Sequence, residues 1–313
     1  MNGRLLMVLY LSLICVSQVN ADTTGVFTFQ NGSFATIPNS TFDTPLGIDN
    51  AGELLLATNG NIFDPVLFSA GNFTSISVPG ATTAAYSMSQ NGTILGSYTA
   101  NTLTYFTYLN GSINNIDLAG FPRTTGNALI NDKGLVILSS FSCCNQPDFI
   151  YDINTAGVTP ISFPGATATS LIAINNNGQV LGVASGGAAG DLYFIYSAGA
   201  FTPLAFPAGC TPVSISDNDE VIGNCFKGGV FEGFLYKSGI FTYLVYNGNA
   251  NSNNTLVSDI NDSGEIVGTF SDVPESSTLS HLVMGLLFFA AMTLHLKRLA
   301  IFALTRSAFM RGY

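Results

Sequence analysis

The sequence predicts an all-β protein in which six copies of a four-stranded unit form a β-propeller. Two linked phrases recur six times, and the turn positions of the first phrase, residues 52, 92, 134, 178, 219 and 264, are 40, 42, 44, 41 and 45 residues apart. A repeat of about 42 residues has the length of one propeller blade. Each phrase has the pattern of a hairpin, and Gly and Pro interrupt every long window, so the repeats show no helical periodicity.

The first phrase is an apolar residue, a polar residue, Asn or Asp, any residue, Gly, and then an apolar strand. Its copies begin at Ile48, Met88, Ile130, Ile174, Ile215 and Ile260. Asn, Asp and Gly adopt a positive φ at low cost, as tight turns require. We therefore expect a turn between two short strands in each copy, with Asp219 at the position where the other copies have Gly.

The second phrase is two aromatic residues separated by one residue, followed by Gly and another apolar residue; in the second copy Leu67-Phe68 stands in place of the aromatic pair. Its copies begin at Phe27, Leu67, Phe106, Phe149, Phe194 and Phe234. The two phrases together predict two hairpins, and so four strands, in each repeat. A β-solenoid is the structural alternative, although its rungs are usually shorter and lack paired hairpins.

These phrases resemble the HAF-type extracellular repeats. The best copy combines Gly233-Phe234-Leu235-Tyr236 with Phe241-Thr242 and the run Ile260 to Gly268, and Pro79-Gly80-Ala81 supplies the middle element of the pattern. The resemblance covers roughly residues 25 to 272. It implies a propeller-like extracellular domain to which no catalytic residues are assigned.

The charge distribution argues against a nucleic-acid partner. Charged residues make up 9% of the chain, and the stretch from Asp22 to Glu275 has four basic and 19 acidic residues, a net charge of 4 − 19 = −15. Phosphate backbones are bound by clustered Lys and Arg. An acidic surface instead favours a protein that stays soluble outside the cell.

The N-terminus predicts a secretory signal peptide over residues 1–21. Arg4 supplies the positive region, Leu5 to Val16 is apolar, and Val19-Asn20-Ala21 provides small residues for cleavage before Asp22. A lipoprotein signal would use Cys15, but the bulky Ile14 before it disfavours that reading. The repeats, residues 22–272, are therefore expected outside the cytoplasm.

A second apolar run, Leu279 to Leu296, predicts a C-terminal transmembrane helix. Lys297 and Arg298 follow it at once, and basic residues at that edge predict a cytoplasmic end. The membrane is therefore an expected partner, and the repeats would lie on the outer side. A buried core helix is the alternative.

Residues 273–298 resemble the PEP-CTERM sorting signal of Gram-negative bacteria, which is a Pro-Glu-Pro motif, a transmembrane helix and a basic cluster. Val273, Pro274 and Glu275 match the motif, and Lys297 and Arg298 match the cluster. The resemblance implies processing by an exosortase-like enzyme and an association with exopolysaccharide. Ser276 replaces the second Pro, a departure that would weaken processing. The tail Leu299 to Tyr313 extends beyond the usual end of the family, and a second membrane-associated segment and a reading-frame extension both remain open.

The residue types of common catalytic sites are missing from the secreted part of the sequence. The two histidines, His281 and His295, both fall in the membrane run, which excludes Ser-His-Asp catalysis and His-based zinc sites from the repeats. The acidic residues mostly occupy repeated turns, as do Asp49, Asp132, Asp217 and Asp262. Asp217 to Glu220 lacks the spacing of an EF-hand loop, and a tight turn is favoured over a Ca²⁺ site. We expect no enzyme and no cofactor.

Cys210 and Cys225 are expected to form a disulfide. They flank the turn Ser216 to Asp219 symmetrically, since 210 + 225 = 216 + 219 = 435, so they face each other across a hairpin. An exported protein meets the oxidising conditions that the bond requires. Cys143 and Cys144 are adjacent, and a vicinal bridge, an intermolecular bridge and the reduced state all remain open.

The sequence predicts an exported surface or matrix protein with a structural or adhesive role in exopolysaccharide. One alternative is a carbohydrate- or protein-binding module that uses aromatic and Asn side chains on one face of the propeller. A second is a glycan lyase or hydrolase that uses carboxylates outside the repeated turns, such as Asp64, Asp148 or Asp191.

Overall fold

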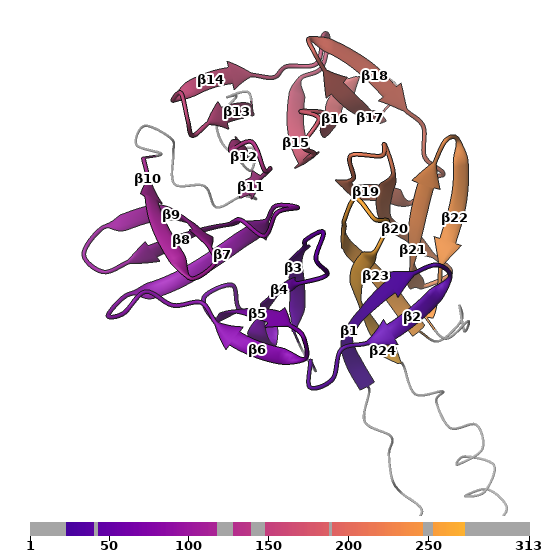
Figure 1. Cartoon of the computed structure of the whole chain (residues 1–313). Coiled ribbons are helices and arrows are strands. Elements are labelled where there is room, and N and C mark those ends of the chain that lie inside the picture. The colour runs from indigo at the N-terminus through magenta and orange to yellow at the C-terminus, as the bar shows by residue number, and fades with distance from the viewer. Residues whose placement is uncertain are drawn as a thin grey trace, which may run out of the picture. The chain divides into compact units, whose positions relative to one another are not determined.

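The repeats form a six-bladed β-propeller, as the phrases predicted. The computed structural model describes residues 23–40, 43–117, 128–138, 148–187, 190–246 and 253–272. They belong to one compact unit, Asp22–Asp272, which contains six antiparallel sheets of four strands each (Figure 1). The prediction of four strands per repeat is confirmed.

The blades are numbered from the first complete one along the chain. Blade 1 has β3 (Thr44–Ile48), β4 (Leu54–Ala57), β5 (Pro65–Ser69) and β6 (Asn72–Ser75), and a 3-10 turn, η1 (Thr58–Gly60), follows β4. Blade 2 has β7 (Thr82–Met88), β8 (Ile94–Thr99), β9 (Leu103–Leu109) and β10 (Ser112–Ile116), and blade 3 has β11 (Ala128–Ile130), β12 (Leu135–Leu138), β13 (Phe149–Asp152) and β14 (Gly157–Pro160).

The other three blades follow the same plan. Blade 4 has β15 (Ala168–Ile174), β16 (Val180–Gly187), β17 (Gly190–Ser197) and β18 (Ala200–Leu204). Blade 5 has β19 (Cys210–Ile215), β20 (Val221–Lys227), β21 (Val230–Lys237) and β22 (Ile240–Leu244). Blade 6 combines β23 (Asn253–Ile260) and β24 (Ile266–Asp272) with β1 (Thr23–Gln30) and β2 (Ser33–Thr36).

Blade 6 closes the ring because it takes two strands from each end of the repeat region. β1 pairs antiparallel with β24 over the register from Thr23 with Asp272 to Phe29 with Ile266. Figure 1 shows the indigo strands β1 and β2 beside the yellow-orange strands β23 and β24. The sequence left ring closure open, and the structure shows that the six blades complete a circle.

The turns have the backbone that their residues predict. In the hairpin from β9 to β10, Asn110 has a φ of 50° and Gly111 a φ of 81°, the positive values that a two-residue hairpin turn with the right-handed twist needs. Asp219, which replaces the Gly of the other copies, has a φ of 59°. Asp is one of the few residues that enters this region readily, so the fifth copy keeps its turn.

The two sequence phrases meet across the second and third strands of each blade. In four blades a second Gly lies in the apolar strand that follows the turn of the first phrase, and it pairs with the first Phe of the second phrase. The pairs are Gly96 with Phe106, Gly182 with Phe194, Gly223 with Phe234 and Gly268 with Phe27. A Cβ on Gly96 would lie 2.4 Å from the Ala84 carbonyl oxygen and 2.6 Å from Phe106 Cζ. Glycine therefore makes the space that each buried Phe fills.

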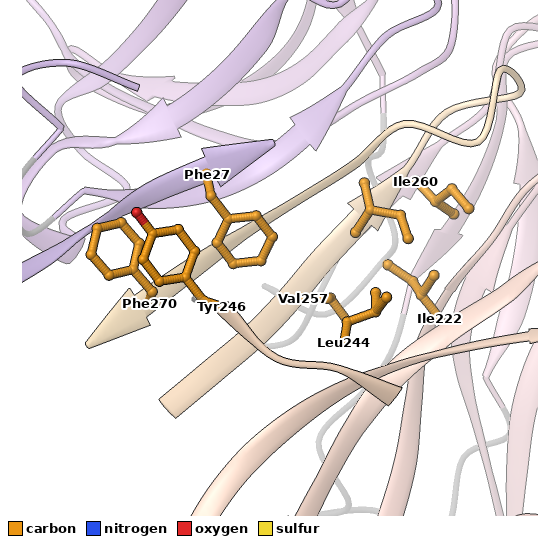
Figure 2. Packing of buried hydrophobic residues seen from close by; sticks show 8 residues of the cluster. Phe27, Ile222, Leu244, Tyr246, Val257, Ile260 and Phe270 are labelled. Carbon is orange, nitrogen blue, oxygen red and sulfur yellow. The ribbon is translucent and has the colours of Figure 1, made fainter. Parts of the chain in front are cut away.

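The core consists of separate apolar clusters between neighbouring blades. The cluster between blades 5 and 6 includes Phe27, Ile222, Tyr246, Val257 and Phe270 (Figure 2). The rings of Tyr246 and Phe270 stack with centroids 4.0 Å apart. Comparable small clusters lie between the other pairs of blades, so each interface buries its own apolar surface.

Several predicted features lie outside the described residues. These are the signal peptide over 1–21, Cys143 and Cys144, the sorting residues Val273, Pro274, Glu275, Lys297 and Arg298, the run Leu279 to Leu296, and the tail 299–313. Among the residues that are described, no helix is long and apolar enough to cross a membrane. The C-terminal transmembrane helix remains a prediction.

Replacing Gly96 with Ala should lower the free energy of unfolding by about 2 kcal/mol, because the added methyl group overpacks the contact with Phe106. Chemical denaturation of the purified variant measures the change. Gly157→Ala is the matched control: the nearest atom to its new Cβ is the Thr155 hydroxyl at 3.1 Å, on the exposed start of β14. We expect a change within about 0.5 kcal/mol there.

A second variant separates overpacking from other effects of the substitution. Blade 1 has the pair Leu56 and Val66 where four other blades have Gly and Phe, so a larger residue on the second strand is compatible with a smaller one on the third. Adding Phe106→Val to Gly96→Ala should recover part of the lost stability. Equal losses for Gly96→Ala and Gly157→Ala would contradict the packing argument.

Candidate functional site

The repeated turns between the first and second strands of the blades form one ring around the axis, which we call the turn ring. It comprises residues 49–52, 89–92, 131–134, 175–178, 216–219 and 261–264. Within a turn, the first polar side chain bonds the backbone of the same turn. Asn131 Oδ1, for example, accepts hydrogen bonds from the backbone N–H of Lys133 at 3.1 Å and of Leu135 at 2.9 Å. The expected turn role of Asp49, Asp132, Asp217 and Asp262 agrees with their positions in this ring.

The turn ring is also continuous from blade to blade. At every junction a backbone N–H of one turn donates to an oxygen of the next. The six bonds are Asn50 N to Gln90 O (2.9 Å), Asn91 N to Asp132 Oδ1 (2.8 Å), Asp132 N to Asn176 Oδ1 (2.8 Å), Asn176 N to Asp217 Oδ1 (2.7 Å), Asp217 N to Asp262 Oδ1 (2.9 Å) and Asp262 N to Asn50 Oδ1 (2.9 Å). Sequence reasoning assigned these side chains to turns and missed that they link the blades.

Amide side chains add a second set of links between the same turns. The Asn131 amide donates to the Asn175 carbonyl at 2.9 Å, and the Asn261 amide donates to the Asp49 carbonyl at 2.9 Å. The second oxygen of Asp262 accepts from the Asn50 amide at 2.8 Å. These carboxylate and amide groups are therefore engaged in holding blades together.

The channel at the centre of the blades is narrow. Residues of the innermost strand of every blade line it, among them Leu46, Ser87, Leu129, Ala173 and Asp259, and its cavity measures about 80 Å³. Pockets that enclose small molecules usually measure about 300–1,000 Å³. The channel has room for a few water molecules rather than for a substrate.

Asp259 is the unusual residue of the channel. The Ser214 hydroxyl donates to its Oδ1 at 2.6 Å, and the backbone N–H of Ile48 donates to its Oδ2 at 3.0 Å, so the carboxyl joins blades 5, 6 and 1. Desolvation raises the pKa of Asp259 to about 6, although these two hydrogen bonds oppose the shift. Sequence reasoning missed this residue because it precedes the turn phrase.

A signal for Asp259 was nevertheless present in the repeats. The residue just before the apolar start of the first phrase is uncharged in every other copy: Gly47, Ser87, Leu129, Ala173 and Ser214. Asp259 is thus a departure from the repeat. Its present partners make it an inter-blade link.

The structure does not bring together the three carboxylates considered for catalysis. Asp64, Asp148 and Asp191 lie at the starts of the third strands of blades 1, 3 and 4. Asp64 accepts from the Asn61 amide at 3.0 Å, Asp148 from the Leu171 N–H at 2.9 Å, and Asp191 from the Ser185 hydroxyl at 2.7 Å. Their separation among three blades gives them no shared site.

Cys210 and Cys225 form a disulfide in blade 5. They are direct partners in the register of β19 and β20, and their sulfur atoms are 2.03 Å apart. Both side chains are buried against Phe234. Within the described ranges, no group of three His, Cys, Asp or Glu side chains is arranged to hold a metal ion.

Two larger pockets open away from the channel, each between neighbouring blades. The 4/5 pocket, between blades 4 and 5, measures about 470 Å³ and is lined by residues 191–193 and 204–211, which include Leu192, Tyr193 and Phe206. The 6/1 pocket, between blades 6 and 1, measures about 350 Å³ and is lined by Thr24, Gly25, Asp43, Thr44, Asn59, Gly60, Asn254, Leu256, Thr269, Phe270 and Ser271. Burial raises the pKa of the Asp43 carboxyl, and a hydrogen bond from the Asn59 N–H opposes the rise.

An exposed aromatic pair lies on blade 5 beside blade 6. Phe226 and Phe231 are direct cross-strand partners with ring centroids 5.0 Å apart, and they are 56% and 38% exposed. The backbone N–H of Phe231 donates to Asn254 Oδ1 at 2.9 Å, and Asn254 lines the 6/1 pocket. One hydrogen bond thus connects the strand of the aromatic pair to the wall of that pocket.

Comparison with known proteins supports the fold. No protein-family profile matches the chain, and no curated protein sequence matches it. Among solved structures, a candidate TolB from Agrobacterium tumefaciens is similar with a TM-score of 0.59 at 13% identity, over 80% of this chain and 99% of that one. TolB from Acinetobacter baumannii is similar with a TM-score of 0.50 at 12% identity, over 85% of this chain and 67% of that one.

An enzyme is also among the structural matches. An inactive virginiamycin B lyase from Staphylococcus aureus has a TM-score of 0.45 at 14% identity, over 76% of this chain and 85% of that one. A similarity of this size carries no argument about activity. The comparisons establish a β-propeller and leave its function to be argued from its own residues.

Asp262→Ala should destabilise the ring, because it leaves the Asp217 N–H and the Asn50 amide without their acceptor. The expected loss is about 2 kcal/mol of unfolding free energy, measured by chemical denaturation. Asp191→Ala is the control, since the partner of that exposed carboxylate within the described residues is Ser185 of its own blade. Losses of the same size in both variants would show that the turn ring contributes no special stability.

The contribution of Asp259 to the free energy of unfolding should fall as the pH rises from about 4 to about 7. Its pKa of about 6 in the folded state exceeds the ordinary value of 3.8, so the folded protein holds this proton more tightly than the unfolded chain does. Asp259→Asn removes the titration. The variant should therefore gain up to about 2 kcal/mol relative to the wild type across this range.

Denaturation curves at both pH values, recorded for wild type and variant together, test this difference. Other titrating groups cancel in the comparison because both proteins contain them. A stability difference that is independent of pH would show that Asp259 titrates normally.

Proposed function

We propose that the chain is an exported, non-catalytic propeller that serves as a structural or binding module at the bacterial cell envelope. The observation that carries the proposal is the use of the repeated polar side chains. A side-chain oxygen of each of these five residues accepts a hydrogen bond from the preceding blade: Asp132, Asn176, Asp217, Asp262 and Asn50. Groups engaged in this way are poorly placed to act as acids, bases or nucleophiles on a substrate.

The disulfide supports export. Structural disulfides form and persist in oxidising compartments and are rare in the bacterial cytoplasm. The bond between Cys210 and Cys225 is buried beside Phe234 in blade 5. A compartment such as the periplasm or the cell exterior suits this arrangement.

The two ends of the sequence suggest how the protein would reach its site. A signal peptide over 1–21 would direct it through the inner membrane, and the run Leu279 to Leu296 would hold it there. An exosortase-like enzyme would process it near Val273-Pro274-Glu275 and pass it to the surface or the matrix. Within an exopolysaccharide matrix, a rigid propeller would serve a structural or adhesive role.

Fractionation and intact mass of the mature protein test the proposal, in cells with and without an active exosortase. We expect the mature protein to lack Met1 to Ala21 in both strains and to lose its C-terminus near Pro274-Glu275 only when the exosortase is active. The disulfide between Cys210 and Cys225 should make its mass two hydrogens lower than that of the reduced protein. The control is a variant with Pro274 and Glu275 replaced by Ala, which should keep its C-terminus in both strains.

Each outcome bears on one part of the proposal. A cytoplasmic protein with free thiols at Cys210 and Cys225 would refute export. A C-terminus retained in both strains would refute sorting and leave a membrane-anchored propeller without a link to exopolysaccharide.

A further inference from the structure

The 6/1 pocket lies where the second strand of blade 1 is short. β4 ends at Ala57, and the 3-10 turn Thr58–Gly60 follows it. The second strands of blades 2, 4, 5 and 6 have six to eight residues, whereas β4 has four. The face of blade 6 that β4 would otherwise cover is left open as the wall of a cavity of about 350 Å³.

That wall presents a row of polar side chains. Thr24, Ser271 and Asn254 are aligned across β1, β24 and β23, since Thr24 pairs with Ser271 and Asn254 pairs with Ser271. The Asn254 amide donates to the Ser271 hydroxyl at 3.1 Å. Thr269 and Leu256 form the next row, and Phe270 lies between the two rows on β24, so this wall has three hydroxyls, one amide and two apolar residues.

The opposite wall comes from blade 1 and supplies a carboxylate. Asp43 and Thr44 precede and begin β3, and Asn59 lies in the 3-10 turn. The Asn59 N–H donates to Asp43 Oδ1 at 3.3 Å, and within the described residues the second oxygen accepts no hydrogen bond. No described residue that lines the pocket is Lys or Arg.

One hydroxyl in the polar row has unused bonding capacity. Thr24 Oγ1 is buried and has no hydrogen-bond partner among the described residues. A buried hydroxyl without a partner is costly, and most such groups in proteins are satisfied. Thr24 itself lines the pocket, so a ligand that turns its side chain toward the cavity is one way to satisfy the hydroxyl.

The chemistry of the walls selects among ligand classes. An anion would find no Lys or Arg among the described lining residues. Seven of the eleven have a hydroxyl, amide or carboxylate side chain, and two, Leu256 and Phe270, are apolar. Hydroxyls and amides both donate and accept, so they match a ligand that is dense in hydroxyl groups, and Asp43 would accept from two adjacent hydroxyls. Phe226 and Phe231 have exposed ring faces on the neighbouring blade 5, and the Phe231 backbone N–H bonds Asn254 of the pocket wall.

We infer that the 6/1 pocket binds one uncharged sugar residue of an oligosaccharide, and that the rings of Phe226 and Phe231 contact the neighbouring sugar residues of the same chain. Thr24, Ser271, Asn254 and Asp43 hold the residue in the pocket by hydrogen bonds. This inference deepens the proposed binding role and rests on it for its biological setting. Binding itself is a property of the folded protein and is measured independently.

Calorimetry of the purified full chain with neutral oligosaccharides tests the inference. The probes are maltotetraose, cellotetraose, a β-1,3-glucan tetrasaccharide and free glucose. We expect at least one tetrasaccharide to bind. Thr24→Val and Asp43→Asn should each weaken that binding by about tenfold, the usual effect of one lost hydrogen bond in a desolvated site.

Phe226→Ala separates a chain of sugars from a single one. It should weaken the binding of the tetrasaccharide and leave the binding of glucose unchanged, because glucose occupies the pocket alone. Thr202→Val is the matched control, as Thr202 is exposed on β18 in blade 4. Thermal unfolding of every variant should match the wild type within a few degrees, so that weaker binding is not a folding defect.

Two results would overturn the inference. The first is that the wild type binds none of the probes, including the case in which part of the chain outside the described residues fills the pocket. The second is that binding occurs and Thr24→Val and Asp43→Asn leave it unchanged, which would place the ligand elsewhere. Export and sorting could still hold in either case, because fractionation measures them separately.

Discussion

A ring of sheets holds together only if every blade is bonded to both neighbours, and the turn ring meets that requirement near the axis. Each junction has a backbone N–H that donates to the next turn, and the circle is complete from Asn50 through Asp132, Asp217 and Asp262 back to Asn50. Apolar clusters between the blades then fill the space farther out. The polar links set the geometry, and the apolar contacts supply most of the stability.

Local features of the fold were predictable from the sequence because they repeat or depend on neighbouring residues. The spacing of the phrases predicted six blades of four strands, and Asp219 was predicted at a turn from its position alone. The pairing of Cys210 with Cys225 followed from the symmetry of one hairpin. The Gly-Phe contacts explain why the two phrases recur together, since each Gly makes room for a Phe on the next strand.

Long-range features were not predictable from the same pattern. Nothing in the residues of β1 indicates that its partner is β24, and the inter-blade bonds of Asp262 depend on the curvature of the whole ring. The 6/1 pocket lies where β4 is shorter than the second strands of blades 2, 4, 5 and 6. A short β4 opens a pocket only because blade 6 lies opposite it. Asp259, Phe226 and Phe231 do not belong to the two repeated phrases. The phrases predicted the strands and turns of the blades, so they gave no indication of these three residues.

The pairing of β1 with β24 also sets an order for folding. Thr23 and Asp272 are neighbours in the sheet and 272 − 23 = 249 residues apart in the chain. Closing so long a loop adds little to the equilibrium cost, which grows only with the logarithm of its length, but contacts this distant in sequence form slowly. Until β24 arrives, one side of β1 is an unpaired strand edge open to other chains. For a chain delivered from its N-terminus, the whole propeller must wait for its last strand, and during that wait it is most exposed to aggregation.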